Sequence, residues 1–530
     1  MNHRGVPMLC EIMGNGRNAR GKAATRSLPA REPGWSNGCR SAQDGSTKCS
    51  PRMGPMLRAT ATCCFALLLI VIDSGAAGQG TTFDTSGTLA AFVAKPDASF
   101  SWRVQRRYTN PNADIIELHF ESQTWQGEIW KHQLLLVRPH RVADERHAVF
   151  VVGGGRWHDE YDSATGDVPL PEDGELFVGI ARLLHAPVVV LGQVPYQPLF
   201  GMTEDKLIAH TFERFLATGD ADWPLLLPMV NSVVRAFDAS SEASEREWGA
   251  PLERFTLTGG SKRGWTTWLT AAVDPRVVAL APIVLDALNM ERHFPHQVEA
   301  WGAPSAAIGP YTALGLDRIL SSPEGAALRQ IVDPFSYRAK LVQPKLIVLA
   351  TNDKYFPLDS ANLYFDELRG PKYLLYLPNE PHSIEHYEPF VRALRALHES
   401  AATGKSLPRL EWEYQELGGE LMLCVRSSPR AKGWRVWRAE SEDRDFRDEQ
   451  WQTVAESARG SARFLLTEPA QGYAAVFGAA SFGALLQAFT LSTSLNVVAA
   501  PNEPPYGTHP AGGTSGLCSA LESTPVVPVP

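Results

Sequence analysis

Cysteine is scarce in this sequence once its first 64 residues are passed. Of the seven cysteines, only Cys424 and Cys518 lie beyond that point. Two cysteines so far apart provide neither a dense disulfide framework nor the paired spacing of a zinc site. One bridge between them could form, but Cys518 falls in a stretch with the composition of a disordered tail, which disfavours the bridge.

Long membrane-spanning runs and an excess of positive charge are also missing. The apolar run at 61–72 is too short to cross a bilayer, because a spanning helix needs about 20 apolar residues, and no later segment is apolar enough. The net charge is −8. Basic residues gather in the first 77, which hold ten Lys or Arg against four Asp or Glu, so the rest of the chain is more acidic than the whole. We therefore expect neither a stable membrane span nor nucleic acid as a partner.

The N-terminal region reads as two parts. Residues 1–52 are rich in Arg, Gly and Ser without apolar periodicity, and we interpret them as an upstream segment outside the true reading start, or as disordered. Residues 53–77 combine a basic start, a short apolar run and small residues near Ala77, which is typical of a cleaved secretory signal peptide. An uncleaved signal anchor is the alternative. We expect secretion, with translation beginning at Met53 or Met56.

The region from 82 to 402 alternates between strand-like and helix-like patterns. Antiparallel strands are expected first, and continuous apolar runs then suit strands that are buried on both faces. These runs lie at 147–152, 187–191, 277–285, 345–350 and 372–377. Helical segments separate most of them, so the pattern predicts an α/β domain. The insertion at 287–342 is too long for one crossover and is expected to form a lid.

One turn carries the clearest chemical signal. Residues 254–269 read RFTLTGGSKRGWTTWL, a β-prone run that meets two glycines and then Ser261, before a helical segment. A strand, a glycine-flanked serine and a helix form the layout of a nucleophile elbow. Glycine tolerates the positive φ of such a turn, and the helix N-terminus stabilises developing negative charge. Gly264 follows the serine by three residues rather than two, so an ordinary glycine-rich turn remains the alternative.

A base and an acid follow later strands. A serine hydroxyl is a poor nucleophile unless a base takes its proton. His382 follows the apolar run at 372–377, and Asp353 follows the run at 345–350. The order Ser, Asp, His is that of α/β hydrolases, so we predict an α/β-hydrolase domain over 82–402. In it, Ser261 is the nucleophile, His382 the base and Asp353 the carboxylate that orients the imidazole.

Other acids and bases were weighed for these roles. Asp286 also ends an apolar run and is the alternative acid. His386 lies four residues beyond His382 and is expected inside the closing helix. His293 and His296 in the lid have the spacing of metal ligands, but no nearby cysteine or paired carboxylate supports a metal site. No cofactor is implied.

Backbone N–H groups near the elbow would hold the oxyanion. A triple-glycine loop follows the run at 147–152, where α/β hydrolases place one donor of the oxyanion hole. We expect an N–H near Gly154 and Gly155 to act with the N–H of Lys262, although a turn without a ligand is the alternative. Glu204 and Asp205 suit the start of a helix, and could instead bind a substrate amine.

The C-terminal region changes to short alternating runs that are separated by turn residues. This pattern predicts a small all-β sandwich over 408–500. The last segment, 501–530, is rich in Pro, Gly, Ser and Thr and is predicted to be a disordered tail.

Nine segments of the chain resemble the PhoPQ-activated pathogenicity-related protein family. The resemblance covers roughly 85–500 and implies a secreted α/β-hydrolase domain with an appended β-sandwich. The segments are SQTWQGEIWKHQLLLVRP (122–139), GQVPYQPLF (192–200), EDKLIAHTFERFL (204–216), WPLLLPMVNSVVRAFD (223–238), LTGGSKRGWTTWLTAAVDPRVVALAPIVLDALN (257–289), ATNDKYFPLDSA (350–361), LPNEPHS (377–383), RDFR (444–447) and GYAAVF (472–477).

The elbow is also similar to that of glucuronoyl esterases, whose motif is G-C-S-R-x-G. The spacing from Ser261 to Gly264 is the same. In those enzymes the residue after the serine is an Arg that helps to hold the oxyanion, so the similarity implies that role for Lys262, through its N–H and its ammonium. A positive charge there would suit an anionic substrate. A solvated lysine at a helix start is the alternative.

The leading hypothesis is a secreted serine hydrolase that cleaves an ester or a peptide bond through an acyl-enzyme. The second hypothesis is a catalytically inactive, secreted signalling or binding protein on a hydrolase scaffold, with the β-sandwich making the contacts.

Overall fold

The computed structural model describes residues 85–162 and 170–529. The predicted signal peptide at 53–77 and the segment 1–52 lie outside these residues. In the part of the chain that is described, no helix is long and apolar enough to cross a membrane.

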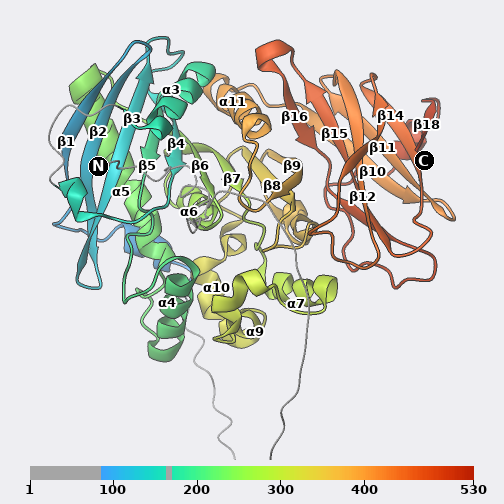
Figure 1. Ribbon diagram of the computed structural model, residues 1–530, viewed down its shortest axis with the longest axis horizontal. Helices are drawn as coiled ribbons and strands as arrows, with labels where there is room; N and C mark the ends of the chain where they lie inside the picture. The colour runs from blue at the N-terminus through green and yellow to red at the C-terminus, as the bar shows by residue number, and fades with distance from the viewer. Residues whose placement is uncertain (1–84, 163–169, 530) are drawn as a thin grey trace, which may run out of the picture. The chain divides into compact units, whose positions relative to one another are not determined.

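A large mixed sheet organises the chain (Figure 1). It opens with three antiparallel strands, namely β1 (Ser101–Asn110), β2 (Ala113–Trp125) and β3 (Glu128–Pro139). β3 pairs antiparallel with β5 (Val188–Leu191), which pairs in parallel with β4 (His147–Val152). Parallel pairing then continues from β4 through β6 (Arg254–Gly260), β7 (Val277–Ile283), β8 (Lys345–Asn352) and β9 (Lys372–Pro381).

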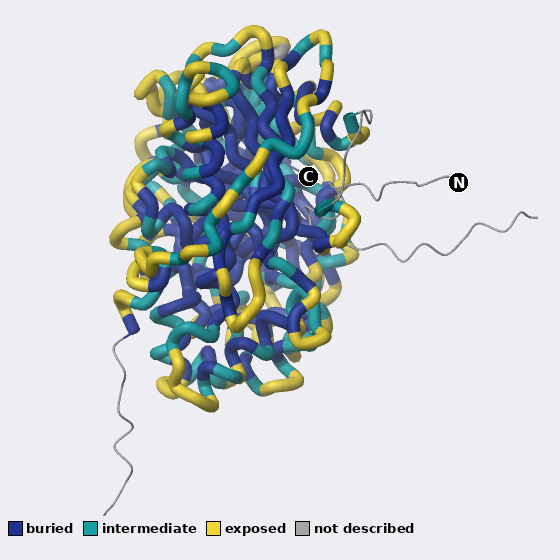
Figure 2. Tube along the Cα trace, turned by 90° about the vertical axis from the view of Figure 1, so that its left-hand side faces the viewer, coloured by how far each residue is buried: buried dark blue, intermediate teal, exposed yellow. Residues whose placement is uncertain are grey.

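The strand order confirms the α/β-hydrolase fold. From β2 to β9 the order is β2-β3-β5-β4-β6-β7-β8-β9, with β3 antiparallel to both of its neighbours. Strands β4 to β9 are buried along most of their length, as Figure 2 shows for the interior of the trace. Burial on both faces explains why these strands read as continuous apolar runs in the sequence.

Helices cover both faces of the sheet. Phe150 of β4 packs on Phe237 of α5 (Leu226–Trp248), with ring centroids 4.8 Å apart. Its neighbours Val149 and Val151 instead face the space beneath α3 (Glu172–Leu184) and α11 (Glu388–Thr403). Because successive residues of a strand point to opposite faces, α5 and the pair α3 and α11 lie on opposite sides. α6 (Lys262–Ala271) packs against α5, as does α2 (Thr88–Val93).

The insertion expected at 287–342 holds short helices. They are α7 (Met290–Trp301), α8 (Gly309–Thr312), α9 (Leu316–Leu320) and α10 (Ala326–Val332). α4 (Glu204–Thr218) packs against three of them, namely α8, α9 and α10. These helices lie together beside the carboxyl ends of the central strands (Figure 1).

The C-terminal strands form two sheets, one of which continues the central sheet. β9 is joined at Leu374 to Ser492 of β16 (Phe489–Ser492). The sheet then runs through β15 (Tyr473–Phe482), β12 (Gly433–Ser441) and β13 (Gln452–Ser457), with β17 (Asn496–Ala499) also paired to β15. The second sheet contains β10 (Arg409–Glu416), β11 (Glu420–Ser428), β14 (Ser461–Thr467) and β18 (Val526–Val529). Two all-β layers are therefore present, but one of them is shared with the hydrolase part.

The prediction of a disordered tail is wrong for residues 501–529. This segment carries α12 (Leu517–Ala520), and β18 pairs in parallel with β14. Cys518 of α12 forms a disulfide with Cys424 of β11, so the bridge that the sequence disfavoured is present. Thr508 also donates a hydrogen bond to the carboxylate of Asp359. All of these partners are distant in sequence, so local composition carries no sign of them.

We predict that the disulfide contributes substantially to stability. It joins residues 94 positions apart, and the loss of a native bridge that closes a long loop typically costs about 2–5 kcal/mol. Cys518→Ser should lower the free energy of unfolding by that amount, measured by urea denaturation. As a control, reducing agent should lower the stability of the wild type to that of the variant and leave the variant unchanged. Equal stability of both proteins without reductant would contradict the prediction.

Candidate active site

Ser261 lies at a strained turn between β6 and α6. Its φ is +55° and its ψ is −122°, a backbone conformation that is costly for a residue with a side chain. Two backbone hydrogen bonds hold it: its N–H donates to the carbonyl of Ile283 at 2.8 Å, and its carbonyl accepts from the N–H of Trp265 at 3.0 Å. The turn therefore has the geometry of a nucleophile elbow.

The unusual glycine spacing has a packing explanation. A Cβ atom on Gly259 would lie 2.7 Å from the carbonyl oxygen of Arg263, and one on Gly264 would lie 3.0 Å from the carbonyl oxygen of Gly259. The end of β6 and the first turn of α6 therefore touch through backbone. Glycine is favoured three residues after the serine because Gly264 faces Gly259 across this contact.

Ser261, His382 and Asp353 form one hydrogen-bonded chain. Ser261 Oγ lies 2.8 Å from His382 Nε2, and His382 Nδ1 lies 2.7 Å from Asp353 Oδ2. The other carboxylate oxygen of Asp353 accepts from the N–H of Tyr355 at 2.7 Å. Asp353 follows β8 and His382 follows β9, so parallel strands bring both to the elbow. All three residues are buried.

The alternative acid, Asp286, and the alternative base, His386, each have other partners. Asp286 accepts a hydrogen bond from the hydroxyl of Tyr364 at 2.6 Å, and burial raises its pKa to about 8. A carboxyl group that is mostly protonated at neutral pH is a poor orienting anion for an imidazole. His386 lies before α11 rather than inside it, and its exposed side chain pairs with Glu380 at 2.6 Å.

The triple-glycine loop is held by the following loop, 192–200. The carbonyl of Gly154 accepts from the N–H of Gln193 at 2.6 Å. The carbonyl of Gly155 accepts from the side-chain amide of Gln197 at 2.9 Å. Gly155 has a φ of +104°, which glycine adopts without penalty. The loop is thus anchored through its carbonyl oxygens.

Glu204 joins this loop to the elbow. Gln197, which holds Gly155, also donates to Glu204 Oε1 at 2.6 Å. Arg263, two residues after Ser261, binds both carboxylate oxygens of Glu204 at 2.7 and 2.9 Å. One chain of polar contacts therefore connects the two segments that are expected to carry the oxyanion donors.

The charged side chains that follow Ser261 form ion pairs with acidic residues at the start of α4. Arg263 is fully buried. Burial alone would raise the pKa of Glu204, but the charges of Arg263 and Lys262 hold that pKa well below its ordinary value. Lys262 Nζ lies 3.0 Å from Asp205 Oδ2 and 3.4 Å from Glu204 Oε2. Asp205 also accepts from the hydroxyl of Tyr311 at 3.0 Å. The ammonium of Lys262 is thus turned to the start of α4.

Sequence reasoning missed a set of hydrogen bonds, here called the brace, between the site and residues 447–451 of the C-terminal region. Asn352, beside Asp353, donates to the carbonyls of Glu449 at 2.8 Å and Arg447 at 3.3 Å. Asn379, three residues before His382, exchanges two hydrogen bonds with the backbone of Trp451, at 2.8 and 3.0 Å. The loops that carry Asp353 and His382 are therefore both fastened to residues 447–451. Both asparagines lie in segments that carry the family resemblance, but their partners are distant in sequence.

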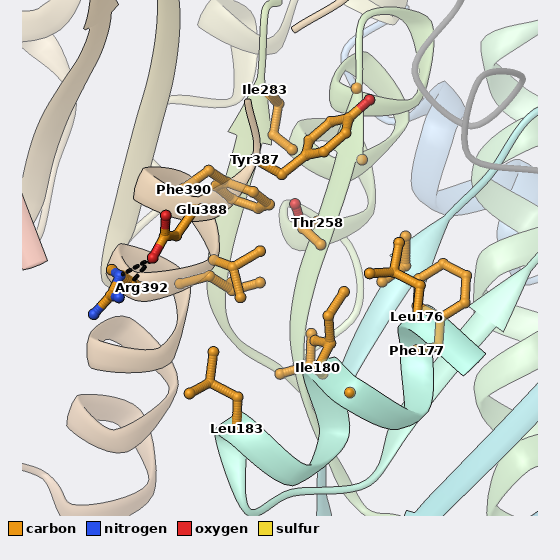
Figure 3. Close-up of a pocket in the computed structure, with 17 residues that line it drawn as sticks. Leu176, Phe177, Ile180, Leu183, Thr258, Ile283, Tyr387, Glu388, Phe390 and Arg392 are labelled. Atoms are coloured by element: carbon orange, nitrogen blue, oxygen red, sulfur yellow. Dashed lines mark hydrogen bonds and ion pairs between the residues drawn. The ribbon is translucent and has the colours of Figure 1, made fainter. Parts of the chain in front are cut away.

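Two cavities lie near the elbow. The Ser261 cavity, of about 50 Å³, is lined by Ser261, by Tyr355 and Phe356, and by residues of the insertion at 287–342. A larger apolar cavity, of about 490 Å³, lies between α3 and α11 (Figure 3). Thr258 reaches the larger cavity from the elbow strand, but neither Ser261 nor His382 lines it. Of these two cavities, Ser261 therefore lines the smaller one.

The two histidines of the insertion, His293 and His296, have protein partners. His296 Nε2 lies 2.7 Å from Asp359 Oδ1, and His293 Nε2 lies 3.0 Å from the amide nitrogen of Gln297. Among the described residues, no group of three or more His, Cys, Asp and Glu could hold a metal ion.

We predict that Glu204→Gln destabilises the protein, because it leaves the guanidinium of Arg263 buried without its anion. The side chain of Glu204 is 35% exposed, so the expected loss, about 1–3 kcal/mol, falls between surface and buried ion pairs. The folded-state pKa of Glu204 is depressed, so its contribution is fully present above the unfolded pKa, declines below it, and is lost only as the pH falls through the folded pKa. Unfolding in urea at pH 7 measures the full loss in the variant, and unfolding at pH 4 should show a slightly smaller difference between the variant and wild type.

Glu213→Gln is the matched control on the same helix. Its carboxylate is 52% exposed and faces His210 at 3.7 Å, so that change should leave stability within about 0.5 kcal/mol of wild type. If both substitutions had the same small effect at both pH values, Glu204 would not be the partner that buried Arg263 requires.

Comparison with known proteins identifies the family of the chain. The family model described as PhoPQ-activated pathogenicity-related protein matches residues 89–447. Autocrine proliferation repressor protein A from Dictyostelium discoideum is 28% identical over 462 residues, which cover 80% of this chain and 92% of that protein.

Solved structures are similar at lower identity. Acetyl xylan esterase 1 from Thermoanaerobacterium sp. JW/SL YS485 is 15% identical with a TM-score of 0.41, covering 59% of this chain and 92% of that chain. The acetyl xylan esterase from Paenibacillus sp. R4 is 14% identical with a TM-score of 0.38, covering 60% and 92%. Because the family model matches more than half of its length, the chain belongs to the PhoPQ-activated pathogenicity-related protein family.

Proposed function

We propose that this protein is a serine hydrolase that cleaves a carboxylic ester through an acyl-enzyme at Ser261. The observation that carries the proposal is the continuous chain from Ser261 Oγ through both nitrogens of His382 to Asp353, with contacts of 2.8 and 2.7 Å. Activating a serine requires a base within hydrogen-bond reach and a third group that orients the base.

The proposed reaction has two halves. Ser261 Oγ attacks the ester carbonyl carbon while His382 Nε2 takes the hydroxyl proton, and the carbonyl electron pair moves onto oxygen. The tetrahedral intermediate collapses by breaking the bond to the alcohol oxygen, which receives the proton from His382. Water then attacks the acyl-enzyme with the same base, releasing the carboxylic acid and restoring Ser261. Asp353 stabilises the imidazolium in both halves.

The oxyanion donors are proposed to be backbone N–H groups. Lys262 is the first residue of α6, and the first N–H groups of a helix have no intrahelical acceptor. The helix dipole adds to their effect. The second donor is an N–H near Gly154 or Gly155. One such donor is worth about 10²- to 10³-fold in rate.

The charge pairing favours an ester over a peptide with a free amino terminus as the substrate. A peptidase that recognises a free amine needs an unpaired carboxylate as anchor. Glu204 is already bound by Arg263, and Asp205 is bound by Lys262 and Tyr311. An ester needs no such anchor.

Secretion is part of the proposal. It rests on the signal-peptide pattern at 53–77 and on the disulfide between Cys424 and Cys518, because structural disulfides persist in oxidising compartments.

A signalling role without catalysis is the second candidate, favoured by the name of the D. discoideum relative, an autocrine proliferation repressor. In that case the hydrogen-bonded chain at Ser261 would have no chemical use, so reactivity at Ser261 separates the two candidates.

Labelling with a fluorophosphonate probe tests the nucleophile. Wild type should be labelled at Ser261, located by peptide mass spectrometry, and Ser261→Ala should not be labelled. His382→Ala should lose labelling because the base is gone, whereas His386→Ala should keep it, since the side chain of His386 is 80% exposed and pairs with Glu380. An unlabelled wild type, beside a hydrolase that is labelled under the same conditions, would overturn the proposal in favour of the signalling candidate.

Asp353→Asn tests the role of the acid. The amide keeps the shape of the side chain but favours the wrong tautomer of His382, so kcat on p-nitrophenyl acetate should fall by about 10⁴-fold. Asp286→Asn should leave kcat within about tenfold of wild type, because Asp286 contacts Tyr364 rather than His382. If the two variants exchanged these effects, Asp286 would be the orienting acid.

A further inference from the structure

We propose that the Ser261 cavity receives the acyl group of the substrate and admits only short, uncharged acyl groups, from acetyl to about butanoyl. This inference rests on the proposed function and names the substrate class of the same site.

The position of the cavity assigns it to the acyl side of the ester. Ser261 and Lys262 line the cavity, whereas His382 does not. His382 must protonate the leaving alcohol, so the alcohol lies on the His382 side of the reacting carbon. The N–H of Lys262 is the proposed partner of the carbonyl oxygen. The remaining substituent of the carbonyl carbon is the acyl chain, and it takes the space that His382 leaves free.

The volume of the cavity limits the length of the chain. About 50 Å³ is available, and one buried water needs roughly 10–15 Å³ of such a cavity, so the space holds about four non-hydrogen atoms. Residues of the insertion at 287–342 line it: Met290 is the first residue of α7, and Ile308 and Tyr311 come from the segment that contains α8. A longer acyl chain would have to displace these side chains, which are all buried.

The walls favour an uncharged chain. Trp265, Phe356 and Met290 give the cavity a mostly apolar surface. The charged groups at its edge are already paired, since Lys262 binds Asp205. His293 is uncharged at neutral pH because burial lowers its pKa to about 3. A carboxylate on the acyl chain would lose its hydration without gaining a free cation, which is costly.

Two series of esters test the assignment on the full-length protein. With p-nitrophenyl esters, kcat/KM should be highest for acetyl to butanoyl and at least about 100-fold lower for octanoyl. A hemisuccinyl ester should be at least about tenfold slower than the butanoyl ester. With acetate esters of methanol, butanol and octanol, kcat/KM should change less than about tenfold, because the alcohol lies outside the cavity.

Lid variants test whether the cavity itself sets the limit. Met290→Ala should raise the octanoyl-to-acetyl ratio of kcat/KM by about tenfold or more, and Ile308→Ala is a second variant with the same expected direction if Met290→Ala folds poorly. Val298→Ala, on the same helix α7 but 44% exposed and outside the cavity, should leave the ratio unchanged.

Fluorophosphonate labelling separates failure of this inference from failure of the proposed function. A wild type that is labelled at Ser261 but hydrolyses octanoyl and acetyl esters equally well would overturn the acyl limit alone. The same conclusion would follow if alcohol length mattered and acyl length did not, or if both lid variants kept the wild-type ratio. An unlabelled wild type that cleaves none of these esters would overturn both.

Discussion

The pairing of Glu204 with Arg263 is the constraint on which the geometry of the site depends. Arg263 has no exposed surface, so its guanidinium needs an anion close by. Glu204 supplies this anion only because the loop 192–203 brings the start of α4 to the elbow. The side-chain amide of Gln197 donates both to the carboxylate of Glu204 and to the carbonyl of Gly155. One buried cation thereby aligns three segments that are far apart in sequence, in a molecule whose whole stability is expected to be about 5–15 kcal/mol.

The elbow motif takes its form from backbone packing as well as from chemistry. Gly259 and Gly264 face each other where β6 meets α6; a side chain at Gly259 would overlap backbone atoms, and one at Gly264 would be crowded by them. This close approach lets Arg263 reach inward to Glu204 while Lys262 keeps its N–H at the helix start. The spacing S-K-R-G is therefore a consequence of one tight crossing and one buried ion pair, rather than a variant of a lipase motif.

The central fold could be predicted from the sequence because its signals are local. Buried parallel strands read as apolar runs, and Ser261, Asp353 and His382 each follow such a run, so shared sheet polarity brings them together. The rest depends on distant partners. Nothing near Cys518 signals Cys424, nothing near Lys262 signals Asp205, and nothing near Asn379 signals Trp451. The prediction of a disordered tail was wrong for the same reason, because its order comes from β14, Asp359 and the disulfide.

The brace formed by residues 447–451 bears on when the site becomes complete. Ser261 and His382 are 121 residues apart, and the segment that fastens the loops of Asp353 and His382 follows later still. Under the proposed function, the support of Asp353 and His382 is complete only when residues 447–451 are in place. A chain that ended before these residues would still contain the serine, the histidine and the aspartate, but it would lack the contacts that fasten two of their loops.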